Sequence, residues 1–218
     1  MNRLAVFDCD GTLIDSQSNI CVAMEGAFAR SGITAPTRAN IRRIVGLSLV
    51  EAVAALLPDA DTKLHTHIAA NYKSAFQSLR ANGLVDEPLF DGIAELLTGL
   101  VEDGWLLGVA TGKSDRGLAL ALEHHGLSGH FVTLQTADRH PSKPHPSMVE
   151  TAMAEAGTDP ANTVVIGDTS FDIAMALNAG ARAVGVAWGY HDIADLVRAG
   201  AHAIARHPVD LNELLEAV

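Results

Sequence analysis

A short apolar run that ends in two aspartates constrains the fold of this chain more than any other feature. Residues 3–12 read RLAVFDCDGT, and the apolar residues 4–7 have the composition of a parallel strand buried on both faces. In open α/β sheets, the chemically active groups gather just beyond the carboxyl ends of the strands. Asp8 and Asp10 are two positions apart on an extended chain, so their side chains point the same way. We therefore expect both carboxylates to face one cleft.

The paired carboxylates indicate a cation in this cleft. Two carboxylates close together repel each other unless a cation or a shared proton lies between them. Mg2+ prefers oxygen ligands and keeps coordination positions free for substrate phosphate. The Asp-x-Asp pattern therefore favours Mg2+ as the cofactor, held at the end of the first strand.

Three further apolar runs predict a parallel sheet. They lie at 105–110, 163–167 and 183–187, and helix-like segments separate them. Strands that alternate with helices are typical of βαβ units, which build α/β proteins with parallel sheets.

Signals for helix starts follow the predicted strands. Asp91 and Ser114 are good N-cap residues, each followed by apolar residues at helical spacing. A third helix is expected to begin at Thr169 or Ser170 and to stop at Gly180. These helices would cover the sheet.

The segment 16–86 differs from the rest of the chain. It contains no run typical of a strand, and glycines and prolines divide it into helix-like pieces. The expected helices lie near 17–30, 37–44, 48–57 and 62–81. Such a stretch is far longer than an ordinary loop of a compact domain. We expect a helical domain at 16–86, inserted into an α/β core that comprises 1–15 and 87–218.

The composition fits a globular protein and limits its partners. The chain has 218 residues, of which 48% are hydrophobic, and a formal net charge of −11. This charge argues against nucleic acid or an anionic membrane surface as the main partner. The chain has only two cysteines, no run that resembles a signal peptide, and no apolar stretch of about 20 residues. We expect a cytoplasmic protein, either a monomer or a homodimer.

Later strand ends and one loop add groups that bind phosphate or metal. Thr111 and Gly112 offer a hydroxyl and backbone N–H groups at a predicted helix start. Lys143, in a loop rich in proline and histidine, can place an ammonium group on a phosphate. Asp168 follows another predicted strand, and Asp172 comes one helical turn later. Each group alone is also explained as an ordinary turn residue, a solvated lysine or a helix-terminal acid.

The order of these motifs resembles the haloacid dehalogenase superfamily of aspartate-nucleophile phosphohydrolases. The motifs that carry the resemblance are DCDGT at 8–12, Thr111 after LLGVA, Lys143 in SKPHP and GDTSFD at 167–172. The resemblance implies a Rossmann-like three-layer core with a parallel sheet. The segment 16–86 lies where this superfamily carries its four-helix cap of the C1 type.

The resemblance also implies catalytic and phosphate-binding roles. Asp8 would attack phosphorus and form an aspartyl-phosphate. Asp10 would protonate the leaving group and then activate the water that hydrolyses the intermediate. Thr111, Gly112 and Lys143 would hold the phosphoryl oxygens. Carboxylate nucleophiles are used in aspartyl-phosphate chemistry, which agrees with these roles.

The metal site implied by the resemblance is built from the same strand ends. Asp8, the backbone carbonyl of Asp10, and Asp168 would bind Mg2+. Asp172 would support these ligands without itself binding the ion. Phosphoryl transfer needs mainly positioning and neutralisation of oxygen charge, which a divalent ion supplies.

The substrate expected from the resemblance is a small phosphorylated metabolite. The segments LFDGI at 89–93 and GVAWGYH at 185–191 resemble the phosphoglycolate-phosphatase-like branch. Gln17-Ser18-Asn19 stands where those enzymes often carry Pro-Asp-Leu, which leaves the exact substrate open.

Three alternatives remain open at this point. One is an inorganic pyrophosphatase, which would use the same chemistry. Another is a β-phosphoglucomutase-like enzyme, although such mutases carry a histidine matching Ile20 and an arginine matching Leu49. The third is a non-catalytic binding module on the same fold, which would predict a lost motif residue, and none is lost.

Overall fold

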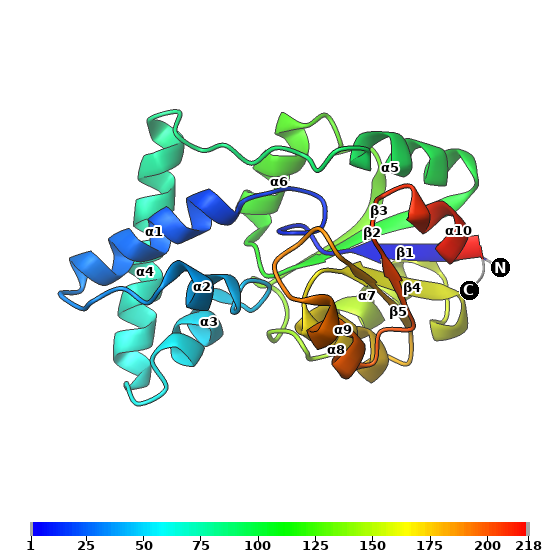
Figure 1. Cartoon of the computed structure of the whole chain (residues 1–218). Helices are drawn as coiled ribbons and strands as arrows, with labels where there is room; N and C mark the ends of the chain where they lie inside the picture. Colours follow the sequence, from blue (N-terminus) through cyan, green and yellow to red (C-terminus); the bar gives the residue numbers. More distant parts are fainter. Residues whose placement is uncertain (1, 217–218) are drawn as a thin grey trace.

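The apolar runs of the sequence form one parallel sheet. In the computed structural model, which describes residues 2–216, six strands lie in the order β3-β2-β1-β4-β5-β6, and each neighbouring pair is parallel (Figure 1). The strands are β1 (Arg3–Phe7), β2 (Trp105–Thr111), β3 (Phe131–Thr136), β4 (Thr163–Gly167), β5 (Arg182–Val186) and β6 (Ala203–Ala205). The four predicted strands are confirmed to within one residue. Residues 1, 217 and 218 of the predicted core lie outside the described part of the chain.

Helices cover both faces of the sheet. They are α5 (Ile93–Glu102), α6 (Asp115–His124), α7 (Ser147–Ala156), a short 3-10 helix (Pro160–Asn162), α8 (Ser170–Asn178), α9 (Ile193–Ala199) and α10 (Asp210–Glu216). Ala5 and Phe7 of β1 pack with side chains of α5, α6 and α10, whereas Leu4 and Val6 pack with those of α7, α8 and α9. The run in β1 is continuously apolar because both of its faces are buried in this three-layer arrangement.

The segment between β1 and α5 folds as a separate group of helices (Figure 1). These are α1 (Gln17–Arg30), α2 (Arg38–Arg42), α3 (Leu49–Leu56) and α4 (Thr62–Ala81). The four predicted helices are confirmed, with α2 ending two residues early. Their apolar side chains form a cluster of their own, in which Phe28, Ile41 and Ile68 are fully buried. We call residues 16–86 the helical insert.

Two of the expected helix starts are confirmed and one is wrong. The hydroxyl of Ser114 accepts a hydrogen bond from the N–H of Gly117, 3.1 Å away, at the start of α6. Thr169, rather than Ser170, caps α8. Asp91 does not cap α5. The N-cap residue is Gly92, which has a φ of 86°, a left-handed conformation that glycine adopts at little cost.

Two strands were not predicted, β3 and β6. In β3, Thr133 and Gln135 are buried polar residues, and Val132 on this edge strand is 54% exposed. The buried side chains of this strand are thus polar and the exposed one is apolar, which is the opposite of the pattern that predicts a strand. The strand β6 has only three residues, too few for a recognisable pattern.

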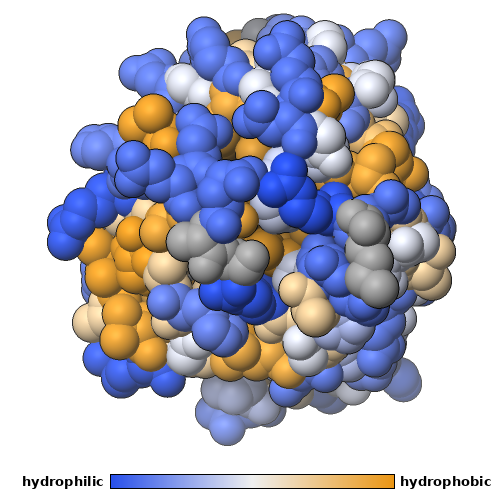
Figure 2. All heavy atoms as spheres, turned by 90° about the vertical axis from the view of Figure 1, so that its right-hand side faces the viewer, coloured by the Kyte–Doolittle hydropathy of each residue, from blue (hydrophilic) through white to orange (hydrophobic). Residues whose placement is uncertain are grey.

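The surface at the end of the molecule opposite the helical insert is mixed. Figure 2 shows hydrophilic side chains over most of this face, with separate hydrophobic patches between them. None of the helices in residues 2–216 combines the length and the apolar character that crossing a bilayer requires.

The cluster inside the helical insert makes a stability prediction. Phe28 on α1 is fully buried, so Phe28→Ala removes a large apolar side chain and leaves a cavity. We expect a loss of about 3–5 kcal/mol in the free energy of unfolding, measured by urea denaturation. Val22→Ala on the same helix is the control, because Val22 is 39% exposed and should cost about 0.5 kcal/mol or less. Equal effects of the two substitutions would contradict the assignment of Phe28 to the core.

Candidate active site

The register of the sheet brings the predicted site residues to one edge. Phe7 of β1 lies opposite Val109 of β2 on one side and Ile166 of β4 on the other. The residues that follow these three positions therefore leave the sheet together. Asp8 begins this turn with its N–H bonded to the carbonyl of Ile166, 2.9 Å away.

Three carboxylates meet at this edge. One oxygen each from Asp8, Asp168 and Asp172 lies within 4.8 Å of the others, and no other such acidic, cysteine or histidine cluster occurs in residues 2–216. All three residues are at most 1% exposed. Asp8 Oδ2 is buried without a hydrogen-bond partner. A buried group of carboxylates with one free oxygen fits a hard divalent cation.

Burial dominates the electrostatics of the cluster. It raises the pKa of Asp8 to about 7, against the opposing effect of Lys143 and with a further increase from Asp172. It also raises the pKa of Asp168 well above its usual range, and the charges of Asp172 and Asp8 add to this. Positive charge beside these groups would favour their ionised forms.

Lys143 supplies one positive charge inside the cluster. Its ammonium Nζ lies 2.9 Å from Asp8 Oδ1 and 2.6 Å from Asp172 Oδ1, and its side chain is fully buried. Burial by itself would lower the pKa of Lys143, but the attraction of Asp172 and Asp8 outweighs it and raises the pKa. The lysine of the predicted loop is therefore part of the site and is not solvated.

The turn after β4 fixes Asp172. Its Oδ2 accepts hydrogen bonds from Thr169 N, at 3.0 Å, and from Thr169 Oγ1, at 2.7 Å, in the capping box at the start of α8. The other oxygen faces Lys143. The same carboxylate thus caps a helix and orients the lysine.

Asp168 is held from both sides by the backbone and by a hydroxyl. Thr12 Oγ1 donates to Asp168 Oδ1 at 3.0 Å, and the N–H of Tyr190 donates to Asp168 Oδ2 at 2.8 Å. A Cβ atom on Gly11 or on Gly189 would lie 2.2 or 2.1 Å from Asp168. Glycine at these two positions allows the chain to pass directly against the carboxylate.

Asp10 has different partners from Asp8. Its Oδ1 accepts a hydrogen bond from the Ser16 hydroxyl and lies 2.9 Å from Lys113 Nζ. The structure places its side chain apart from the three-carboxylate cluster. Lys113 in turn contacts Glu87 Oε1, also at 2.9 Å.

Thr111 and Gly112 lie where β2 meets the helical insert. Thr111 is fully buried, and its hydroxyl accepts a 3.2 Å hydrogen bond from the N–H of Lys113. A Cβ on Gly112 would lie only 2.6 Å from the carbonyl oxygen of Leu47 and 2.9 Å from that of Gly46. The insert therefore rests on the end of β2.

Two further contacts tie the insert to the rest of the chain beside the site. The N–H of Ser48 donates to Ser142 Oγ at 2.8 Å, next to Lys143 in the sequence. His191 Nε2 donates to the carbonyl of Arg43 at 3.1 Å. The insert thus covers the end of the sheet at which the carboxylates lie.

Sequence reasoning missed several residues around the site. Lys113, Glu87 and Ser16 contact Asp10 or its partner, yet none of them was assigned a role from the sequence. Tyr190 packs against the apolar cluster of the insert, and its backbone N–H donates a hydrogen bond to Asp168. A backbone contact of this kind leaves no signal in the side-chain pattern.

Comparison with known proteins identifies relatives of this arrangement. The sequence model of the family described as haloacid dehalogenase-like hydrolase matches residues 5–186. The chain is 38% identical over 198 residues to a probable phosphatase, IndB, of Dickeya dadantii, covering 88% of this chain and 84% of that protein. It is 28% identical over 194 residues to a phosphoglycolate phosphatase of Vibrio vulnificus, covering 87% and 85% of the two chains.

A solved structure supports the fold. A predicted phosphatase from Clostridium acetobutylicum superimposes with a TM-score of 0.90 over the whole of both chains, at 24% sequence identity. At this identity the likeness bears on the architecture and not on the substrate.

The contact at Gly112 makes a testable prediction. Gly112→Ala places a methyl group against the backbone of residues 46–47, which cannot move as a flexible side chain would. Overpacking of this kind costs about 1–3 kcal/mol. We expect roughly 5- to 150-fold faster hydrogen exchange in residues 44–49, measured by mass spectrometry. Gly129→Ala is the control, because a Cβ there meets no atom within 4 Å. Unchanged exchange in Gly112→Ala would show that the insert does not rest on this turn.

Proposed function

The chain belongs to the haloacid dehalogenase-like hydrolase family, and from that premise we propose that it is a Mg2+-dependent phosphatase that acts on a small phosphorylated metabolite. The observation that carries the proposal is the buried cluster of Asp8, Asp168 and Asp172 around the Lys143 ammonium. In the core of an α/β protein, such a cluster at the carboxyl edge of the sheet is suited to phosphoryl transfer.

Asp8 is the proposed nucleophile. One of its oxygens is held by Lys143, and the other has no hydrogen-bond partner. One carboxylate oxygen of Asp8 attacks phosphorus, the bond from phosphorus to the leaving oxygen breaks, and an aspartyl-phosphate forms. A carboxylate oriented in this way loses little conformational entropy when it reaches the reactive geometry.

Asp10 is the proposed acid and base. It gives its proton to the leaving oxygen in the first step and takes a proton from water in the second. The resulting hydroxide attacks the aspartyl-phosphate, which releases inorganic phosphate and returns Asp8 to its carboxylate form. General acid–base catalysis of this kind contributes about 10²–10⁴-fold.

The phosphoryl oxygens need positive groups and N–H or O–H donors. We assign this role to the Lys143 ammonium, the Thr111 hydroxyl and the backbone N–H of Gly112. Asp8, Asp168 and the backbone carbonyl of Asp10 would hold Mg2+, while Asp172 keeps Lys143 in place. When bound, Mg2+ supplies positive charge that offsets the charge of the phosphoryl oxygens and favours ionised Asp8.

The helical insert, residues 16–86, is the proposed cap domain over a core of residues 1–15 and 87–218. Its contacts with the turn after β2 and with the loop before α7 support this division. Closure of such a lid excludes water and restricts the size of the leaving group. A lid that limits the size of the leaving group favours a small substrate of the phosphoglycolate type. We place the enzyme in the cytoplasm.

The structure bears on the phosphomutase alternative. Ile20 and Leu49 stand at the positions where such mutases carry a histidine and an arginine. Both pack in the apolar cluster of the insert. They offer no polar group for a sugar, so we favour hydrolysis. Pyrophosphate hydrolysis remains an outcome of the substrate test.

The first test is a substrate panel. We expect Mg2+-dependent phosphate release from one of 2-phosphoglycolate, pyrophosphate, β-glucose 1-phosphate and a set of sugar and nucleoside monophosphates. Asp8→Asn should reduce kcat to the level of the blank, because an amide cannot serve as the nucleophile. Glucose 6-phosphate formed from β-glucose 1-phosphate would identify a mutase. Substantial turnover by Asp8→Asn would refute the nucleophile assignment.

The second test concerns the metal and needs no substrate. Mg2+ at about 100 times its Kd should stabilise the protein by about 2.7 kcal/mol. This corresponds to a rise in Tm of roughly 5–10 °C for a chain of this size. EDTA should abolish the rise, and so should Asp168→Asn. The control Asp59→Asn, an exposed aspartate on the insert, should retain it. A rise of equal size in Asp168→Asn would place the ion elsewhere.

A further inference from the structure

Four charged side chains form a line from the helical insert to the site. Arg80 Nη2, at the end of α4, lies 3.1 Å from Glu87 Oε2. The other carboxylate oxygen, Glu87 Oε1, lies 2.9 Å from Lys113 Nζ. Lys113 Nζ is also 2.9 Å from Asp10 Oδ1. The charges alternate in sign along this line, so each inner group has an opposite charge on both sides.

This line is largely shielded from solvent. The side chain of Glu87 is 5% exposed and that of Lys113 is 11% exposed, as is that of Asp10. Burial by itself would lower the pKa of Lys113, but Asp10 and Glu87 outweigh it and hold the pKa well above its usual value. Removing one partner of a buried ion pair costs much more folding free energy than removing one partner of an exposed pair.

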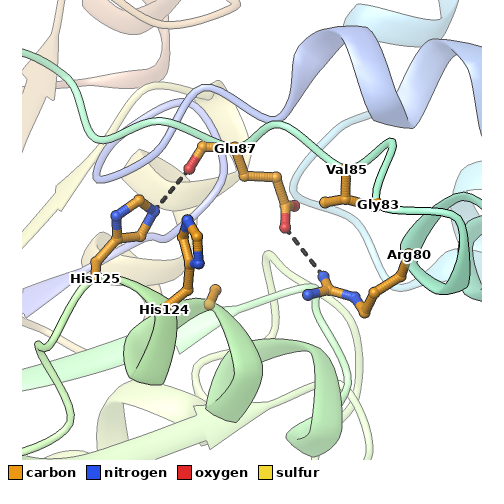
Figure 3. A pocket seen from close by; sticks show the side chains of 7 residues that line it. Arg80, Gly83, Val85, Glu87, His124 and His125 are labelled. Atoms are coloured by element: carbon orange, nitrogen blue, oxygen red, sulfur yellow. Dashed lines mark hydrogen bonds and ion pairs between the residues drawn. The ribbon is translucent and has the colours of Figure 1, made fainter.

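Glu87 is fixed by its backbone as well as by its side chain. His125 Nε2 donates to the carbonyl oxygen of Glu87 at 2.7 Å (Figure 3). This bond ties residues 82–92, the linker between α4 and α5, to the end of α6. In the same view, the carboxylate of Glu87 points away from His125 towards Arg80, beside a cavity of about 110 Å³. Both carboxylate oxygens of Glu87 are thus engaged, by Arg80 and by Lys113.

The ammonium of Lys113 pairs with the carboxylates of Asp10 and Glu87. A lysine side chain is a flexible four-carbon stem with a single point charge. The ring of Phe76 in α4 lies 5.9 Å from Lys113 Nζ, a weaker contact than the two carboxylates. The position of the ammonium therefore depends on Asp10 and Glu87 together.

We propose that Glu87 is a positioning residue for Asp10, acting through Lys113. Glu87 holds the ammonium at the end of the site, and the ammonium fixes the Asp10 carboxyl group where it meets the leaving oxygen. The inference rests on the proposed function, in which Asp10 protonates that oxygen. It assigns a role to the linker after the insert, which no motif of the family resemblance includes.

The test compares leaving groups. An alkyl phosphate has a poor leaving group that needs protonation by Asp10, whereas p-nitrophenyl phosphate has a good one that does not. The quantity compared is kcat/KM, which ends with the first irreversible step, here the transfer of the phosphoryl group to Asp8. A change confined to the alkyl phosphate therefore reports on proton donation.

Glu87→Gln should lower kcat/KM for the alkyl phosphate about 10- to 100-fold, the loss typical of a misplaced catalytic group. The value for p-nitrophenyl phosphate should change less than about threefold, and the fall should be in kcat more than in KM. Glu87→Asp, which keeps the charge, should recover part of the loss. Equal losses on both substrates would overturn the proposal in favour of a merely structural role.

A double variant tests whether Glu87 acts through Lys113. Lys113→Met removes the charge and keeps the length of the stem. If Glu87 works only by holding the ammonium, Glu87→Gln combined with Lys113→Met should lose no more than Lys113→Met alone. Losses that multiply would contradict the inference, as would a Lys113→Met variant without leaving-group dependence.

Controls separate this inference from the proposed function. Glu123→Gln neutralises an exposed glutamate on α6 and should leave both substrates unaffected. Tm values identify any variant that has lost its fold. If Glu87→Gln is such a variant, the leaving-group dependence of Lys113→Met is used in its place. If the wild-type protein hydrolyses neither of these phosphates nor any member of the substrate panel, the proposed function fails and the inference falls with it. If the wild type hydrolyses both and Glu87→Gln matches it on both, only the inference fails.

Discussion

The Lys143 ammonium between Asp8 and Asp172 is the interaction on which the rest of the site depends. Three buried carboxylates at one sheet edge would repel each other, and burial alone pushes the pKa of Asp8 and Asp168 upward. One lysine inside the cluster offsets part of this cost. Removing one partner of such a buried pair typically costs about 3–5 kcal/mol, so chemistry and stability share the same contacts.

Asp8 and Asp10 are two residues apart, yet they belong to separate charge networks. Asp8 is oriented from within the core, by a lysine whose other partner caps a helix. Asp10 is oriented by Lys113, which follows β2, and by Ser16 at the start of the insert. In the proposed mechanism one carboxylate attacks and the other exchanges protons, and these two tasks need different surroundings. The separation allows one short turn to provide both.

The sequence predicted the parts of this molecule in which one physical rule dominates. Continuous apolar runs mark strands buried on both faces, and β1 follows that rule. The strand β3 does not, because Thr133 and Gln135 bury polar groups that donate hydrogen bonds to Glu155 of α7. At the site, motif residues were identified by type and order. The contact of Lys113 with Glu87 was not, because it depends on how the insert's linker packs against α6.

The position of β1 in the sheet has a consequence for synthesis of the chain. This strand lies between β2 and β4, and β4 begins only at Thr163. At about 5–20 residues per second, a ribosome makes that second partner roughly 8 to 30 s after β1. The insert draws its apolar cluster almost entirely from its own residues, all of which are made before β2. The strand β1, which leads directly into Asp8, therefore waits longest of the six strands for its second neighbour.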